Sequence, residues 1–203
     1  MSDALCRTDF KTESPTNDER LLHEIRAGKE ASFRELYARY QGLLFRFALH
    51  MTGSVATAED ITQDVFIQLI CKPGSYDASK GSLPAYLFGI TRNLARASLR
   101  STRANLALDD VAEAEMVPAS DAELVDCLSS SEALDSLRRA LLALPELYRE
   151  VVVLCDLEEM TYADAATVLE CSAGTIASRL HRAHNILRGK LVGIRGRTAQ
   201  DRS

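Results

Sequence analysis

Tryptophan is absent from the chain of 203 residues, other aromatic residues are few, and there are only 10 glycines and 5 prolines. Leucine, alanine, arginine and glutamate recur instead, and this composition favours helices over sheets. No run of about 18 apolar residues is present to span a bilayer, and the first residues lack the basic and then apolar order of a signal peptide. We therefore expect an all-α, cytoplasmic protein with no direct membrane insertion.

The five cysteines are widely spaced and include no Cys-x-x-Cys pair, so neither a disulfide framework nor a zinc ribbon is indicated. Cys155 and Cys171 would serve either as a redox pair or as small apolar residues of the core. A metal site would have to recruit Cys171 with His181 and His184, but no carboxylate has a matching spacing. We expect no metal and no other cofactor.

Charge of one sign is missing from two neighbouring segments. Residues 84–105 contain four arginines and no acid, whereas residues 106–136 contain nine acids and no lysine or arginine. Residues 161–203 are basic again, with seven basic residues against three acids. The overall net charge of -5 therefore conceals two cationic segments, which indicate a polyanion bound at two places.

The acidic segment contains Pro118 and a run of three serines, and its apolar residues have no sustained helical period before Leu124. We interpret residues 105–131 as a flexible acidic linker between two small helical domains. Such a segment serves as a solvated spacer, or it occupies a cationic channel of a partner, or it shields the basic surfaces of the free protein.

The first half of the chain predicts a helical domain over residues 18–104, preceded by a disordered tail over residues 1–17. The apolar residues indicate helices that begin at Asp18, extend over 33–48 and 56–70, and resume at Pro84. In the third of these helices, Ile61, Val65 and Leu69 share one face. The opposite face carries Asp60, Gln63, Asp64 and Ile67. Ile67 there is either the dry centre of a partner-binding surface or an ordinary exposed aliphatic residue.

The fourth helix combines an apolar side with a stripe of arginines at steps of four, four and three residues. The stripe consists of Arg92, Arg96, Arg100 and Arg103. A helix with four arginines and no acid on one face repels itself, so this face is best suited to phosphates. Tyr86 and Phe88, near the start of the helix, would either stack on unpaired bases or pack in the core.

The second half predicts a helix-turn-helix over residues 132–192, followed by a tail over residues 193–203. Thr161 begins a short helix as a hydroxyl cap, and Ser172 caps a longer one after a tight turn. The longer helix carries an apolar face of Ile176, Leu180, Ala183 and Leu187. Its other face carries Thr175, Ser178, Arg179 and Arg182, which are types that read bases and phosphates in a major groove.

These motifs together resemble a known family, the extracytoplasmic-function (ECF) group of sigma-70 factors of bacterial RNA polymerase. Residues 58–66 (AEDITQDVF) resemble the helix of region 2 that binds core polymerase, and residues 83–94 (LPAYLFGITRNL) resemble the segment that engages the minus-10 element. Residues 161–166 (TYADAA) and 172–183 (SAGTIASRLHRA) resemble region 4, which reads the minus-35 element. The order of these motifs also matches, with an acidic linker between them.

The resemblance implies roles for three groups of residues. The core-polymerase contacts, on the clamp helices of the largest subunit, would be Asp60, Gln63, Asp64 and Ile67. The minus-10 DNA contacts would be Tyr86, Phe88, Arg92, Asn93, Arg96 and Arg100. The minus-35 DNA contacts would be Ser172, Thr175, Ser178, Arg179 and Arg182.

The resemblance also implies partners: core polymerase, with its flap region, promoter DNA, and an anti-sigma factor that restrains the protein. It implies no enzymatic activity, because the chemistry of transcription belongs to the polymerase. The alternative from another class is a helix-turn-helix regulator that does not bind polymerase. That alternative leaves the region around Asp60 and the arginine stripe unexplained.

Overall fold

The structure, a computed structural model, describes residues 15–72, 74–108 and 131–200. Over these residues the chain forms helices joined by short turns, and no strand occurs among them. The expectation of an all-α fold is therefore confirmed. None of the described helices is both long enough and apolar enough to cross a membrane.

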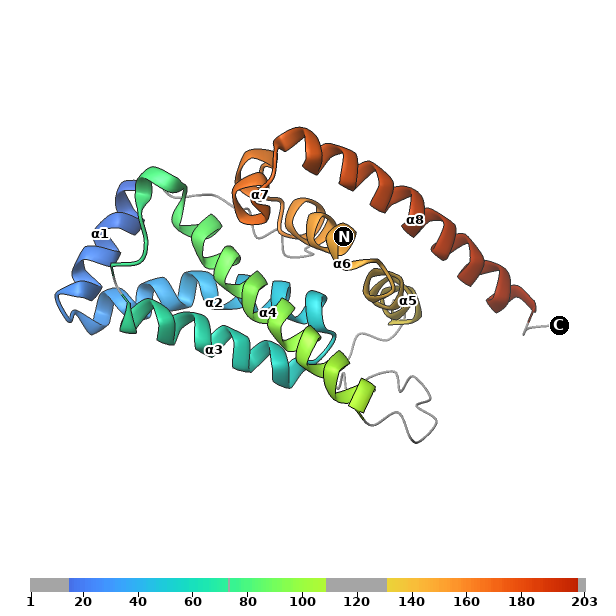
Figure 1. Ribbon diagram of the computed structural model, residues 1–203, viewed down its shortest axis with the longest axis horizontal. Helices are drawn as coiled ribbons and strands as arrows, with labels where there is room; N and C mark the ends of the chain where they lie inside the picture. Colours follow the sequence, from blue (N-terminus) through green and yellow to red (C-terminus); the bar gives the residue numbers. More distant parts are fainter. Residues whose placement is uncertain (1–14, 73, 109–130, 201–203) are drawn as a thin grey trace, which may run out of the picture.

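A first group of helices comes from the N-terminal half of the chain. They are α1 (Pro15–Arg26), α2 (Glu30–Thr52), α3 (Val55–Cys71) and α4 (Leu83–Leu108), with a short 3-10 turn η1 (Ala78–Lys80) before α4. Helices α2 and α3 pack along each other, and α4 crosses both of them (Figure 1). The largest buried side chains include Phe47 of α2, Leu69 of α3 and Phe88 of α4. Burial of these apolar surfaces is the main favourable term for the bundle.

The turn between α2 and α3 is fixed by two local signals. Gly53 adopts φ 75°, in the left-handed region that favours glycine, and its N–H donates to Leu49 O at 2.7 Å. Ser54 then caps α3, because its hydroxyl accepts a hydrogen bond from Thr57 N at 3.2 Å. A β-carbon on Gly53 would lie 3.0 Å from Leu142 Cδ1, so this turn also packs against the second half of the chain.

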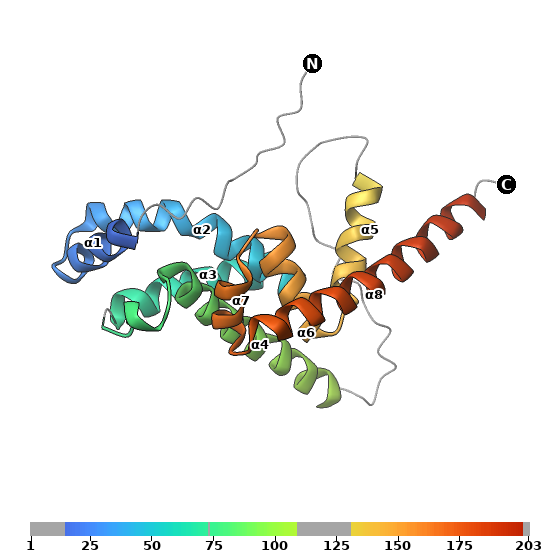
Figure 2. The same cartoon turned by 90° about the horizontal axis from the view of Figure 1, so that it is seen from above.

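A second group of helices comes from the C-terminal half. They are α5 (Ser131–Leu142), α6 (Glu146–Val152) continued by a π-helical turn η2 (Val153–Leu157), α7 (Tyr162–Leu169) and α8 (Ala173–Gln200). Helix α8 extends well beyond the other helices (Figure 2). Helix α8 continues into the predicted tail, residues 193–203, as far as Gln200, since no proline follows Pro145 to stop the helix.

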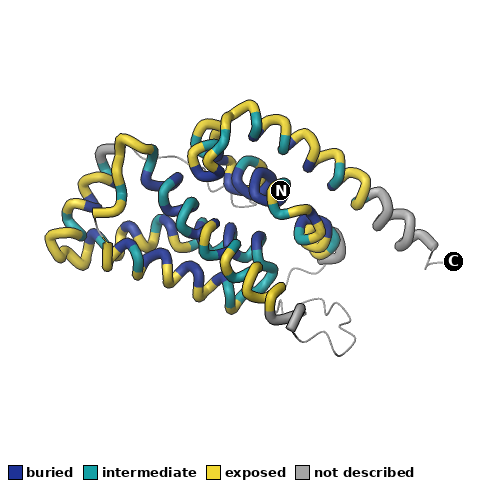
Figure 3. The backbone as a smooth tube through the Cα atoms, viewed as in Figure 1, coloured by how far each residue is buried: buried dark blue, intermediate teal, exposed yellow. Residues whose placement is uncertain are grey.

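The two groups of helices pack against each other, with α5 on α2 and α7 on α4. Figure 3 shows buried residues in both groups on the sides where they meet, and a single apolar cluster extends through both. The predicted linker, residues 105–131, lies largely outside the described residues, as does most of the predicted tail at 1–17. At their borders, α1 begins at Pro15 and α4 continues to Leu108.

Candidate nucleic-acid and partner interfaces

The outer face of α3 has the surface character that its sequence predicts. Asp60, Gln63 and Asp64 are exposed, and Ile67 keeps 54% of its surface accessible. The opposite face of the same helix is buried, as Val65 illustrates with 0% exposure. The helix thus presents an apolar centre surrounded by polar and acidic side chains, which is the usual composition of a protein-binding surface.

The arginine stripe of α4 is less open than the sequence indicated. We call Arg92, Arg96, Arg100 and Arg103 the arginine face. Arg100 is exposed, but Arg92 is buried with 7% exposure, and Arg96 is half-buried. Arg92 therefore does not face the solvent, because another helix covers it.

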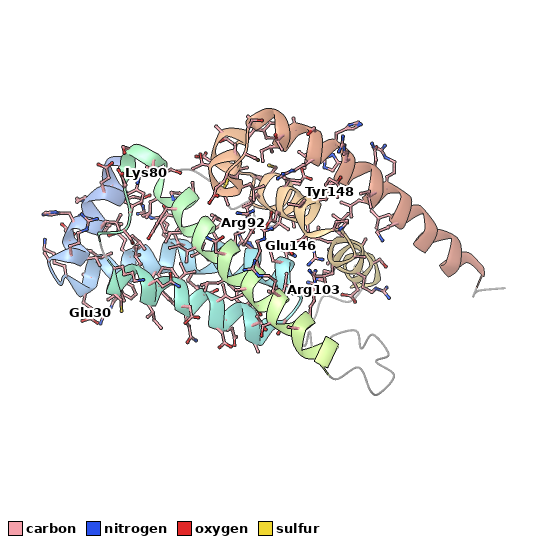
Figure 4. All side chains as sticks on the ribbon, in the orientation of Figure 1. Glu30, Lys80, Arg92, Arg103, Glu146 and Tyr148 are labelled. Atoms are coloured by element: carbon pink, nitrogen blue, oxygen red, sulfur yellow. The ribbon has the colours of Figure 1, made fainter. Side chains whose placement is uncertain are left out.

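That helix is α6, which brings two carboxylates onto the arginine face. Arg92 Nε donates to Glu150 Oε1 at 2.8 Å, and Arg96 Nε lies 3.6 Å from the same oxygen. Arg96 also donates to Glu146, and Arg103 Nη1 lies 3.9 Å from Glu146 Oε2. Figure 4 shows Arg92, Arg103 and Glu146 between α4 and α6. Three of the four predicted phosphate-binding arginines are thus paired with carboxylates of the C-terminal half.

The two aromatic residues of α4 have different surroundings. Phe88 is fully buried and meets Phe47 edge-on, with ring centroids 5.4 Å apart. The prediction that Phe88 stacks on bases conflicts with this position, since the ring fills the core of the bundle. Tyr86 is half-buried, packs near Tyr76 at 5.5 Å between centroids, and shares a hydrogen bond with Ser75.

Tyr86 lines a groove of about 310 Å³ between the segment before α4 and helix α7. Asn93 of α4 also faces this groove, and Thr167 and Glu170 close its other side. A hydrogen bond of 3.3 Å from the Ser82 hydroxyl to the carboxylate of Asp164 connects the two sides. The groove therefore has both of its sides only while the two halves of the chain are in contact.

The predicted helix-turn-helix is present in α7 and α8. Thr161 caps α7 by accepting from Asp164 N at 3.1 Å, and its hydroxyl donates to the Asp164 carboxylate at 2.7 Å. Glu170 ends α7 in the left-handed conformation, and Ser172 caps α8 by accepting from Thr175 N at 3.1 Å. The predicted apolar face of α8 is buried throughout, at Ile176, Leu180, Ala183 and Leu187.

The predicted groove-reading residues gather on the first turns of α8. Ser178 and Arg182 are exposed, whereas Thr175 and Arg179 are half-buried. The hydroxyls of Ser172 and Thr175 lie 2.9 Å apart, and Ser178 donates to Thr175 O at 3.0 Å. The hydroxyls therefore have partners within the helix, and Arg182 is the most accessible cation of this face.

Sequence reasoning missed the acidic residues that face the arginines. Glu146 and Glu150 are four residues apart on α6, which is also the spacing between Arg92 and Arg96 on α4. This matching spacing is the signal in the sequence from which the pairing of the glutamates with the arginines could have been predicted. A further ion pair, Arg46 Nη2 to Glu158 Oε2 at 2.9 Å, also joins the halves, and burial raises the pKa of Glu158 while Arg46 opposes that rise.

The cysteines and histidines that the structure describes are not gathered into a candidate metal site. Cys155 and Cys171 are both free and half-buried, and burial raises the pKa of the Cys155 thiol to about 11, which disfavours its thiolate. His184 pairs with Asp156 at 2.6 Å, and His181 contacts Asn185 instead of a metal-binding partner. Within the described part of the chain, no group of three potential metal ligands occurs.

Two family models match the chain in the order that the motifs predicted. The model described as "Sigma-70 region 2" matches residues 36–105, and "Sigma-70, region 4" matches residues 134–184. The first contains the α3 surface and the arginine face, and the second contains the helix-turn-helix.

Individual relatives agree with the family models. The chain is 32% identical over 170 residues to the ECF RNA polymerase sigma factor SigE of Mycolicibacterium smegmatis, covering 83% of this chain and 65% of that protein. It is 32% identical to the RNA polymerase sigma factor CarQ of Myxococcus xanthus, covering 85% of this chain and 95% of CarQ. The chain is similar in fold to the sigma factor RpoE of Bartonella quintana, whose structure was solved in complex with the anti-sigma factor NepR. The TM-score is 0.63 and the sequence identity is 28%, and the match covers 78% of this chain and 96% of the RpoE chain.

Proposed function

The chain belongs to the ECF group of the sigma-70 family of RNA polymerase sigma factors, and from that premise we propose that it binds core polymerase, recognises minus-35 and minus-10 promoter elements, and promotes strand opening. The observation that carries the proposal is the presence of both regions, in order, on one chain. A helix-turn-helix regulator that does not bind polymerase would need only the second region. We assign the protein no enzymatic activity of its own, because the polymerase makes and breaks the bonds.

In the proposed complex, α3 docks on the clamp helices of the largest polymerase subunit. Ile67 would enter the dry centre of that interface, and Asp60, Gln63 and Asp64 would pair with polar and basic groups around it. The exposure of all four side chains supports this role. The second region would lie against the flap region of the polymerase.

The minus-10 element would meet α4. Arg96, Arg100 and, after exposure, Arg92 would bind phosphates, and Asn93 and Tyr86 of the same helix would hold unpaired bases. Unstacking a base costs a few kcal/mol per step, and stacking on an aromatic ring offsets a similar amount. We leave Phe88 out of the proposed interface, because its ring is buried.

The minus-35 element would receive the N-terminal turns of α8 in its major groove. Arg182 and Arg179 would donate forked hydrogen bonds to guanine edges. The hydroxyls of the exposed Ser172 and Ser178 and of the half-buried Thr175 would contact phosphates or bases. Docking of the second helix of a helix-turn-helix in this way is the general geometry of the motif.

The regulator of the protein would be an anti-sigma factor, and the protein would act in the cytoplasm, where polymerase and DNA are found. The Bartonella RpoE structure contains such a partner, NepR.

The experiment that tests the proposal is in vitro transcription with purified core polymerase on a pool of bacterial promoter fragments. The wild-type chain should direct transcripts with defined start sites. A variant with Asp60→Arg and Asp64→Arg should direct none, because two reversed charges on the docking face repel the partner.

A matched control carries Glu19→Arg and Glu30→Arg, which reverse two exposed acids on α1 and α2. This control should retain transcription. If the wild type gives no transcript and does not co-purify with core polymerase, the proposed function is wrong.

A further inference from the structure

Helix α8 is longer than the part of it that the region 4 family model matches, because the match ends at residue 184 and the helix continues to Gln200. We propose that the turns of α8 after residue 184 bind the sugar-phosphate backbone of duplex DNA beside the minus-35 groove, through Lys190. We call residues 185–200 the α8 extension. The inference rests on the proposed function, and it adds to the minus-35 site a contact that does not depend on base sequence.

The charge of α8 is of one sign. The helix contains six basic residues and no acid, and four of the basic residues belong to the α8 extension. Within the described residues, a carboxylate pairs with a side chain of α8 only at His184, which contacts Asp156 at 2.6 Å. Three arginines of the arginine face on α4 are paired with carboxylates, whereas the exposed Arg182 and Lys190 of α8 keep their charge open to a polyanion.

Helical spacing divides the exposed cations between two sides of α8. Lys190 lies eleven residues after Arg179, which is about three turns, so these two residues share a face. Arg188 lies nine residues after Arg179, which is about two and a half turns, so it lies on the opposite side. Both Arg188 and Lys190 are exposed. The face with the predicted groove-reading residues therefore continues at Lys190 but not at Arg188.

The distance along the helix determines which part of DNA Lys190 would contact. Arg182 and Lys190 are eight residues apart, which corresponds to about 12 Å along the helix axis. The major groove is about 12 Å wide, so when Arg182 reaches base edges, Lys190 lies at the backbone that borders the groove. The recognition helix of a homeodomain contacts the DNA backbone with its C-terminal end in a similar way. Lys190 is thus placed for a phosphate and not for a base.

Gly189 leaves room for a close approach on the same face. It lies seven residues after Arg182, which is about two turns, and a β-carbon at this position would meet no neighbouring atom within 4 Å. Glycine weakens a helix relative to alanine, and packing among the described residues does not require it here. The bare helix surface next to Lys190 instead allows a phosphate to come close to the backbone of α8.

The helix dipole does not explain the position of Lys190. Basic residues are favoured in the last turn of a helix, and the effect falls off within that turn. Helix α8 ends at Gln200, ten residues after Lys190. The alternative to phosphate binding is therefore that Lys190 is simply solvated, and a binding experiment distinguishes the two.

The test measures binding of the full chain, without polymerase, to a short fluorescent DNA duplex of mixed sequence at several salt concentrations. Lys190→Gln should weaken binding at low salt and make the plot of log affinity against log salt concentration shallower by about 0.9, the value for one phosphate contact. The control Arg188→Gln removes the same charge from the opposite side of α8 and should leave the slope within about 0.3 of the wild type. Both positions are exposed, so circular dichroism should give the same helix content for all three proteins.

A second readout separates phosphate binding from base reading. Across duplexes of different sequence, Lys190→Gln should weaken binding by one common factor, so the ratios of the affinities stay unchanged. Arg182→Gln, at a position proposed to read guanine, should change those ratios. Altered ratios for Lys190→Gln would overturn the phosphate contact.

Equal slopes for Lys190→Gln and Arg188→Gln, or no measurable binding of the wild type at the lowest salt concentration, would also overturn the inference. So would a loss of affinity of Lys190→Gln for core polymerase with an unchanged slope for DNA, which would assign the position to a protein contact. These results leave the proposed function untouched, because transcription is measured separately. Conversely, a wild type that gives no transcripts would overturn the function, while a shallower slope for Lys190→Gln would still establish the phosphate contact.

Discussion

Arg149 shows how much one side chain contributes to the contact between the two regions. It is buried, and its guanidinium donates to the carbonyl oxygens of Met51 at 2.6 Å and Leu144 at 3.0 Å, and also to Leu142 O. These oxygens lie at or near the ends of α2 and α5, where backbone carbonyls have no partner within the helix. Arg149 thereby caps two helices from different halves of the chain.

Replacement of this residue, Arg149→Gln, should lower the free energy of unfolding by about 2 to 4 kcal/mol, because a shorter amide leaves buried carbonyls unpaired. Chemical denaturation followed by circular dichroism measures the change. The matched variant Arg139→Gln, at an exposed position of α5, should cost less than about 0.5 kcal/mol. Similar losses in both variants would show that the capping described for Arg149 is unimportant.

His50 makes the same contact sensitive to pH. Burial, together with the nearby Arg138 and Arg46, lowers the pKa of His50 below its ordinary value of 6.5. The unfolded chain therefore binds a proton near pH 6.5 that the folded chain does not, so stability decreases as the pH falls through that range.

Denaturation curves measured at about pH 7.5 and about pH 5.5 test this effect of His50, because a histidine changes charge between these two pH values. The wild type should lose more stability between the two conditions than His50→Gln, which has no proton to gain. Since all other titrating groups are common to both proteins, the difference isolates His50. The explanation fails if the two proteins lose the same amount.

At the scale of helices, local signals determine where each element begins and ends. Thr161 and Ser172 cap α7 and α8 through bonds to backbone N–H groups three residues later. Such contacts span only one turn, which is why the sequence alone predicted the helix-turn-helix and the buried face of α8. Pairing across the chain has no comparable local signal.

The cap of α7 gives a direct test at this scale. Thr161→Ala should destabilise the protein by about 1 kcal/mol, whereas Thr161→Ser should retain most of the stability, because serine keeps the hydroxyl that accepts from Asp164 N. Hydrogen exchange of the α7 amides should accelerate in the alanine variant. Equal protection in the two variants would contradict the role given to the cap.

The sequence did not predict the contacts between side chains and segments that are distant in the chain. The arginines of α4 were correctly placed on one face, but their cover by α6 depends on contacts between residues about fifty positions apart. Phe88 illustrates the same limit, because helical periodicity does not say which of two neighbouring faces turns towards Phe47. The π-helical turn after α6 also has no composition signal in the chain.

At the scale of the whole molecule, the uneven charge of the chain explains why its two halves meet at the arginine face. The arginine face carries positive charge that needs a counter-charge, and α6 supplies it in the structure. In the proposed promoter complex, DNA phosphates would supply it. Two arginines, Arg92 and Arg96, therefore contribute both to the contact between the halves of the chain and to its proposed activity.

The most direct test of this account is the reactivity of promoter thymines to permanganate, which marks unpaired bases, in complexes of core polymerase with the chain. Thymines of the minus-10 element should react only when core polymerase and the chain are both present. Arg96→Ala with Arg100→Ala should reduce the reactivity while core binding persists. Thymines that stay unreactive in a stable complex of polymerase, wild-type chain and promoter would contradict the account.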